Sequence, residues 1–210
     1  MSDQKIVKIM LAIRHTLKGG PAEFGGDLPG GVIGKVGRDR ITAMKFPVYI
    51  NSARFDAFGS GCLRTHQCLF HLVVDHELQA VSHDALFNMG SDELFNGWIE
   101  KGLRDAAAEM GTLFLGVLKI LGGEKFEKTA FVIAGDIKNA FSVMKYDIGL
   151  GFFHSPTIEM AAWSFDNNVE LSLKEDEGVV FVQLEDGSVH YYGTWLSGDD
   201  IPDPGDDFEK

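Results

Sequence analysis

Histidine and cysteine side chains gather between residues 62 and 83, and these residue types bind metals or act as nucleophiles. Four of the seven histidines lie between His66 and His83, and the chain's two cysteines are Cys62 and Cys68. If this segment is a strand, His66 and Cys68 point to the same side and Cys62 can join them from the preceding loop. Cys62, His66 and Cys68 are therefore candidates for a metal site or for a thiol enzyme, and the alternative is a set of partly buried, hydrogen-bonded side chains near a strand that crosses the core.

Better-known catalytic spacings are incomplete in this sequence. His76-Glu77 begins the zinc-peptidase pattern H-E-x-x-H, but the second ligand position holds Ala80. Gly34-Lys35 invites comparison with a phosphate-binding loop, but the serine or threonine that should follow is missing. The sequence therefore has no diagnostic catalytic signature, and we predict no cofactor.

A second group combines cations with aromatic rings between residues 35 and 49. The segment 41–50 is rich in β-branched and aromatic residues, which predicts a strand. Cations beside aromatic rings could neutralise phosphates and stack bases, as in proteins that bind single-stranded nucleic acid. The candidate nucleic-acid-binding residues are Lys35, Arg38, Arg40, Lys45, Phe46 and Tyr49.

Charge is unevenly distributed along the sequence. The net charge is -12, with +5 over residues 1–65, -5 over 66–135 and -12 over 136–210. Residues 197–210 contain five aspartates and one glutamate, which predicts a flexible acidic tail. In composition this tail is similar to those of bacterial single-stranded-DNA-binding proteins. If folding keeps the two ends apart, their opposite charges favour contacts between copies of the chain.

The composition predicts a single folded domain inside the cell. The chain has 210 residues, of which 45% are hydrophobic, enough for one substantial core over residues 1–196. The closest candidate for a membrane span, residues 113–121, is much shorter than the roughly 18 apolar residues required. The apolar run near the N-terminus ends at Arg14, before it reaches the length of a signal-peptide core. We expect a cytoplasmic protein that does not bind membranes.

Hydrophobic periodicity predicts helices in the first and middle parts of the chain. Apolar residues recur at helical spacing over residues 3–18. A capping residue and an apolar stripe predict a helix after Ser91. The all-round hydrophobicity of residues 113–121 predicts a helix at the centre of the fold or one that faces a partner. Residues 19–37 contain eight glycines and predict an irregular arm.

The C-terminal half is expected to supply most of the sheet. Asp186-Gly187 predicts a two-residue hairpin turn in which both residues have positive φ. The predicted fold class is α+β, an antiparallel sheet packed against helices from the N-terminus and the middle of the chain. The expected strands are 41–50, 68–74, 129–134, 140–146, 157–165, 169–173, 179–185 and 188–196.

Three functional hypotheses follow from these patterns. The leading one is a non-enzymatic interaction or assembly module that binds itself or another protein through the glycine-rich arm, the apolar helices and the oppositely charged ends. The alternatives are a single-stranded nucleic-acid-binding protein with a regulatory acidic tail, and a metal- or thiol-dependent enzyme at Cys62, His66 and Cys68. An enzyme is the less expected outcome, because no catalytic motif is complete.

Overall fold

A six-stranded sheet forms the centre of the computed structural model, which describes residues 5–16, 32–44, 54–59, 63–83 and 92–195. Its strands are β1 (Ile6–Arg14), β2 (Arg54–Gly59), β3 (Gln79–Ser82), β4 (Ile148–Phe153), β5 (Gly178–Leu184) and β6 (Val189–Trp195). They lie in the order β3-β2-β4-β1-β5-β6. Strands β3, β2, β4 and β1 are parallel, whereas β5 is antiparallel to both β1 and β6. The four parallel strands therefore end at the same edge of the sheet.

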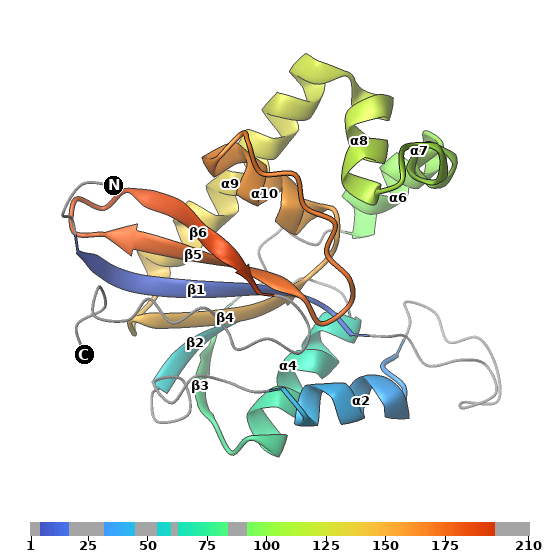
Figure 1. Ribbon diagram of the computed structural model, residues 1–210. Coiled ribbons are helices and arrows are strands. Elements are labelled where there is room, and N and C mark those ends of the chain that lie inside the picture. The colour runs from blue at the N-terminus through green and yellow to red at the C-terminus, as the bar shows by residue number, and fades with distance from the viewer. Residues whose placement is uncertain (1–4, 17–31, 45–53, 60–62, 84–91, 196–210) are drawn as a thin grey trace.

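Helices cover both faces of the sheet (Figure 1). One layer holds α2 (Lys35–Thr42) and α4 (Leu63–Asp75), which bury their apolar sides against one face. The other layer holds α6 (Asp92–Glu100), α7 (Leu103–Met110), α8 (Leu113–Leu121), α9 (Gly123–Val143) and α10 (Thr157–Phe165). None of the helices in the described ranges is long and apolar enough to cross a membrane.

Within the segment 3–18, predicted as a helix, residues Ile6–Arg14 form strand β1 instead, and residues 3, 4, 17 and 18 lie outside the described residues. This strand lies between β4 and β5 and is buried on both faces. Ile9 and Ile13 belong to the core on one side, and Met10 and Ala12 belong to the core on the other. A strand buried on both faces shows no polar–apolar alternation, so its apolar residues also fit helical spacing. The helix prediction is wrong for this reason.

The mixed α+β class is confirmed, but the sheet differs from the expected one. Its strands come from the whole chain and most of its pairings are parallel, whereas an antiparallel sheet from the C-terminal half was predicted. The helices predicted at 113–121 and after Ser91 are confirmed as α8 and as α6 with α7. The hairpin strands at 179–185 and 188–196 are confirmed within one residue or so as β5 and β6.

Several predicted strands are helical in the structure. Residues 68–74 lie in α4, residues 129–134 and most of 140–146 lie in α9, and residues 157–165 form α10. The buried residues of α9 recur at intervals of three or four positions, which is the helical period. Windows of about six to nine residues are too short to distinguish that period from a buried strand.

Two further predicted segments differ in other ways. The described beginning of 41–50 completes α2 and the bend after it, and the rest lies outside the described residues. Residues 169–173 are irregular rather than a strand. Most of the glycine-rich arm and the whole acidic tail also lie outside the described residues, although the end of the arm forms the start of α2.

Strands β5 and β6 form the expected hairpin through a different turn. The Leu184 N–H donates to the Ser188 carbonyl at 2.9 Å, so the loop spans 185–187 rather than two residues. Within this loop only Gly187 has a positive φ, 82°. A two-residue turn would have set a different register. Next to the turn the two strands therefore pair one residue away from that register, and a bulge further along restores it.

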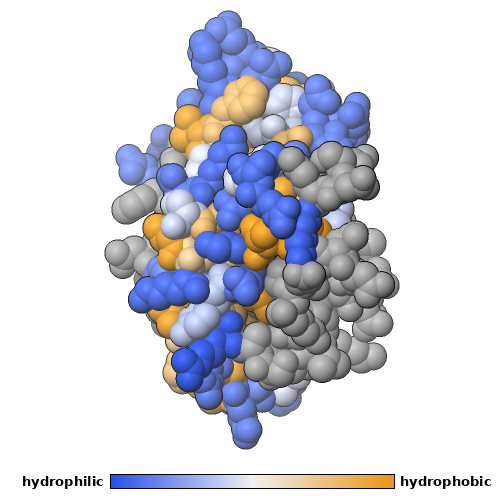
Figure 2. Space-filling view, turned by 90° about the vertical axis from the view of Figure 1, so that its left-hand side faces the viewer, coloured by the Kyte–Doolittle hydropathy of each residue, from blue (hydrophilic) through white to orange (hydrophobic). Residues whose placement is uncertain are grey.

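Folding brings the basic first third of the chain against the acidic last third. Arg14 lies 3.0 Å from Glu175, and Arg40 lies 3.2 Å from Asp176. The separation of charge required by the assembly hypothesis is therefore absent at these pairs. On the face seen in Figure 2, apolar side chains form small groups interspersed with polar ones.

We predict that Gly178→Ala destabilises the sheet where β5 approaches β1. A Cβ at Gly178 would lie 2.5 Å from the Ala12 carbonyl oxygen, so one backbone must move. The free energy of unfolding, measured by urea denaturation, should fall by about 1–3 kcal/mol. The control is Gly135→Ala on α9, where the added Cβ meets nothing within 4 Å and helix propensity improves. Equal stability of the two variants would contradict the close approach.

Candidate active site

Two histidines that are distant in the sequence meet at the carboxyl edge of the sheet. The register of the parallel strands β1 and β4 pairs Arg14 with Phe153, and the next residues are His15 and His154. The His15 N–H donates to the Phe153 carbonyl at 3.0 Å. The two imidazole centroids lie 4.6 Å apart in an edge-to-face arrangement. Mostly parallel sheets commonly bind ligands at this edge.

His15 is fixed in one tautomer and one charge state. Its Nδ1 lies 3.0 Å from the Thr16 carbonyl oxygen. Because a carbonyl can only accept, Nδ1 carries the proton and Nε2 keeps its lone pair. Burial lowers the pKa of His15 well below its ordinary value, and the Arg64 cation lowers it further. At neutral pH this residue therefore presents a neutral, nucleophilic Nε2.

His154 is also neutral near pH 7. Burial lowers the pKa of His154 to about 4, and the cations Arg64 and Arg14 contribute to the change. Its Nε2 atom is buried and has no hydrogen-bond partner. The site therefore combines two uncharged imidazoles with two cations, an arrangement that favours an added anion.

The two arginines come from separate elements. Arg14 is the last residue of β1, and Arg64 lies in the first turn of α4, which follows the carboxyl end of β2. The Nε atoms of both side chains are buried without a hydrogen-bond partner. Guanidinium groups are well suited to bind tetrahedral oxyanions such as phosphate, and a buried donor without an acceptor costs free energy. These atoms are suitable donors to an oxyanion beside His15.

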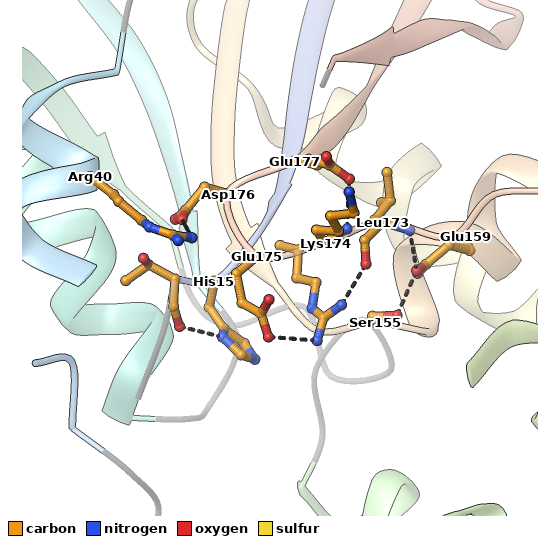
Figure 3. A network of polar contacts seen from close by, with 11 residues as sticks. His15, Arg40, Ser155, Glu159, Leu173, Lys174, Glu175, Asp176 and Glu177 are labelled. Carbon is orange, nitrogen blue, oxygen red and sulfur yellow. Dashed lines mark hydrogen bonds and ion pairs between the residues drawn. The ribbon is translucent and has the colours of Figure 1, made fainter. Parts of the chain in front are cut away.

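Arg14 is held by residues 173–177, which we call the 173–177 turn. Figure 3 labels the five residues of this turn. Its Nη1 donates to the Leu173 carbonyl at 2.5 Å, and its Nη2 donates to the Glu175 carboxylate at 3.0 Å. Its backbone N–H donates to the Glu177 carbonyl at 2.8 Å. Both the main chain and the guanidinium of Arg14 are therefore fixed by this turn.

Asp176 connects the same turn to α2. Its N–H donates to the Arg14 carbonyl at 3.1 Å, and its carboxylate accepts from Arg40 at 3.2 Å. Asp176 has a left-handed backbone with φ of 70°, an uncommon conformation for a residue other than glycine. The neighbouring Thr16 hydroxyl donates to the Gly37 carbonyl of α2 at 3.4 Å. Helix α2 thus supports the segment that carries His15.

Glu159 is a carboxyl buried within the first turns of α10. The residue is 1% exposed, and its Oε1 accepts from the Ser155 hydroxyl at 2.5 Å and from the Leu173 N–H at 3.3 Å. Burial raises the pKa of Glu159 to about 7. In Figure 3, Ser155 and Glu159 lie on one side of the 173–177 turn and Arg40 lies on the other.

The residues predicted as a metal or thiol site are not brought together on one side of a strand. His66 and Cys68 lie on α4; His66 is exposed with its ring beside Gly59, whereas Cys68 is buried in the core. Cys62 lies outside the described residues. Within the part of the chain that the structure describes, no group of three or more His, Cys, Asp or Glu side chains could hold a metal ion.

The candidate nucleic-acid-binding residues lie on a helix where they are described. Lys35, Arg38 and Arg40 belong to α2, and Lys45, Phe46 and Tyr49 lie outside the described residues. Each of the three cations lies within 4 Å of a carboxylate. The pairs are Lys35 with Asp39, Arg38 with Asp75, and Arg40 with Asp176.

Sequence reasoning did not select the residues that converge at the sheet edge. Arg64 was not among the candidate site residues, and Arg14 was considered only as the end of an apolar run. A signal was nevertheless present, because two apolar runs, 6–13 and 148–153, are each followed within two residues by a histidine. Interpreting the first run as a helix concealed the similarity.

Comparison with known proteins identifies similar folds despite low sequence identity. No family model matches the sequence, and no curated protein matches it. One similar structure is phosphoglycerate mutase from Bacillus anthracis str. Sterne, with a TM-score of 0.59, 14% identity and coverage of 92% of this chain and 95% of the other.

Two further structures contain bound oxyanions. The protein histidine phosphatase SixA complexed with tungstate matches with a TM-score of 0.54 and 10% identity, over 90% of this chain and 97% of the other. A mycobacterial glucosyl-3-phosphoglycerate phosphatase in complex with VO3 matches with a TM-score of 0.52 and 11% identity, over 91% of this chain and 99% of the other. The chain therefore shares the fold of these enzymes.

These similarities correct the functional interpretation drawn from the sequence. The chain was interpreted as a non-enzymatic, self-associating module, but its structural neighbours are a mutase and phosphatases. The assembly hypothesis, its two alternatives and the expectation of no enzyme are therefore replaced by an enzyme-like fold. The charge pattern was misleading because distance along the sequence does not keep charges apart in the folded chain.

Glu159→Gln should make stability rise with pH relative to the parent. The pKa of Glu159 is about 7 in the folded chain against an ordinary value of 4.5, so the folded state holds the proton more tightly. The parent therefore loses stability as pH rises from about 5 to about 8, whereas the amide of the variant has no proton to lose. The difference in free energy of unfolding between pH 5 and pH 8 should reach up to about 3 kcal/mol. Parallel urea-stability profiles of variant and parent would disprove this assignment.

Proposed function

We propose that the protein is a phosphatase that transfers a phosphoryl group from a phosphate monoester to His15 and then to water. The observation that carries the proposal is a neutral His15 whose ring contacts His154 and whose pKa is lowered by burial and by Arg64 and Arg14 nearby; these three neighbours carry three buried nitrogens without a hydrogen-bond partner. These are the Nε atoms of Arg14 and Arg64 and the Nε2 atom of His154.

The reaction has two balanced steps. In the first, the His15 Nε2 lone pair forms a bond to phosphorus, the bond from phosphorus to the ester oxygen breaks, and the leaving oxygen takes up a proton. In the second, a water oxygen bonds to phosphorus, the nitrogen–phosphorus bond breaks, and the water releases a proton. Ester and water become alcohol and inorganic phosphate, and His15 returns to its neutral form.

The Thr16 carbonyl has a defined part in this reaction. It holds the proton on Nδ1 of His15, which leaves the lone pair on Nε2 and stabilises the positive charge that develops on the ring during attack. This is the role that an orienting acceptor has beside a catalytic histidine.

The arginines supply the charge that a phosphoryl group requires. Transfer of this group depends mainly on positioning and on stabilising negative charge at its oxygens. Arg14 and Arg64 lower the pKa of His154, which places both cations in its electrostatic environment. Tungstate and VO3, the anions bound by two structural neighbours, have the same oxyanion character as phosphate.

The main test is hydrolysis of p-nitrophenyl phosphate. His15→Ala should lower kcat by at least about 10³-fold, because it removes the nucleophile. His190→Asn is the matched control, because His190 is exposed on β6 and bonds only within the hairpin to Ser188, so its activity should stay within about twofold. Activity retained in His15→Ala would rule out the proposed nucleophile.

Anion binding provides a test without turnover. Tungstate should raise the melting temperature of the parent, because a ligand that binds only the folded state stabilises it. Arg64→Met should weaken tungstate binding at least about tenfold, since a charge-assisted hydrogen-bond donor is lost. Arg104→Met, at an exposed position on α7, should bind tungstate like the parent. Equal binding by both variants would show that Arg64 does not contact the anion.

A further inference from the structure

Glu159 lies where two parts of the proposed active site meet. Its Oε1 accepts from the Ser155 hydroxyl at 2.5 Å, and Ser155 directly follows His154. The same oxygen accepts from the Leu173 N–H at 3.3 Å. One carboxyl therefore joins the end of β4 to the 173–177 turn.

The connection continues from Leu173 to Arg14. The Leu173 carbonyl accepts from Arg14 Nη1 at 2.5 Å, so this residue receives the arginine on its carbonyl and donates to Glu159 from its N–H. Glu175, two residues further along the turn, holds the other end of the guanidinium at 3.0 Å. With both Nη atoms held by the turn, the buried Nε of Arg14 remains without a partner.

A carboxyl at this depth carries an energetic cost. Glu159 is 1% exposed, and its Oε2 is buried without a hydrogen-bond partner. An apolar side chain of similar size would fill the same space without that cost. The hydrogen bonds to Ser155 and Leu173 are the interactions of Glu159 that such a side chain would lose.

We propose that Glu159 is a positioning residue of the active site, which fixes His154 and Arg14 relative to each other through Ser155 and Leu173. This inference rests on the proposed phosphatase function. Glu159 itself does not touch the transferred group. It sets the distance between His154 and Arg14, which in the proposal contact the transferred group. An error of about 1 Å in such a distance can lower a rate by about 100-fold.

Two substitutions separate the hydrogen bonds of Glu159 from its volume. Glu159→Gln keeps an oxygen acceptor for both Ser155 and Leu173, whereas Glu159→Leu has a similar volume and no acceptor. Met160→Leu is the control, because Met160 is equally buried on α10 and packs only in the core. The measurements are kcat and KM for p-nitrophenyl phosphate, the tungstate dissociation constant, and the NMR signal of the Arg14 Nε–H.

The Gln variant should retain kcat/KM and tungstate affinity within about threefold, and the Leu variant should lose about 10- to 100-fold in both. The Arg14 Nε–H signal should shift in the Leu variant and stay in place in the Gln variant and in Met160→Leu. The inference is overturned if the folded Leu variant matches the parent, or if the Gln variant is as impaired as the Leu variant.

A second variant covers the case in which Glu159→Leu does not fold. Ser155→Ala removes only the hydrogen bond that joins Glu159 to the residue after His154, and it should lower kcat/KM at least about fivefold in a protein that remains folded. Parent-like kinetics in Ser155→Ala would then overturn the inference. If the parent neither hydrolyses the ester nor binds tungstate, the phosphatase function fails, and the Arg14 signal alone decides whether Glu159 positions this side chain.

Discussion

The parallel pairing of β1 with β4 is the constraint on which the site depends. Its register sets Arg14 opposite Phe153, so the residues that follow, His15 and His154, emerge side by side. A slip of two residues between these strands would move one histidine by about 7 Å relative to the other. The 173–177 turn, α2 and α10 then adjust the side chains around a position that the sheet has already set.

The electrostatics of the site favour an added anion, although Glu175 already pairs with one Nη atom of Arg14 at 3.0 Å. Burial and nearby cations keep both imidazoles neutral, and the buried arginine nitrogens Nε lack acceptors. Such an arrangement destabilises the free protein slightly and is relieved by an oxyanion. The uncharged His15 that results is the form that the proposed phosphoryl transfer requires, so in that proposal the same desolvation favours both anion binding and nucleophilic attack.

The sequence allowed the fold class and the simplest local elements to be predicted, but not the site. Helix α8 and the β5–β6 hairpin have unambiguous local signals, an apolar helix that begins after Thr112 and a glycine with positive φ at 187. Strand β1 does not, because burial on both faces removes the alternation that identifies a strand. If β1 is interpreted as a helix, its pairing with β4 is not predicted, and the sequence gives no indication that His15 and His154 lie close together. Their proximity depends on a pairing across 139 residues, which no local pattern contains.

The attachment of Arg14 to both the sheet and the 173–177 turn affects the entropy cost of binding an anion at the proposed active site. Its N–H, its carbonyl and two guanidinium nitrogens are engaged before any anion arrives. The side chain is therefore already ordered before an anion binds. The entropy cost of ordering it is part of the folding free energy and does not reduce the binding affinity. In the proposed active site a small anion can therefore be held by few contacts, and we expect the residues that surround the site to discriminate between larger molecules.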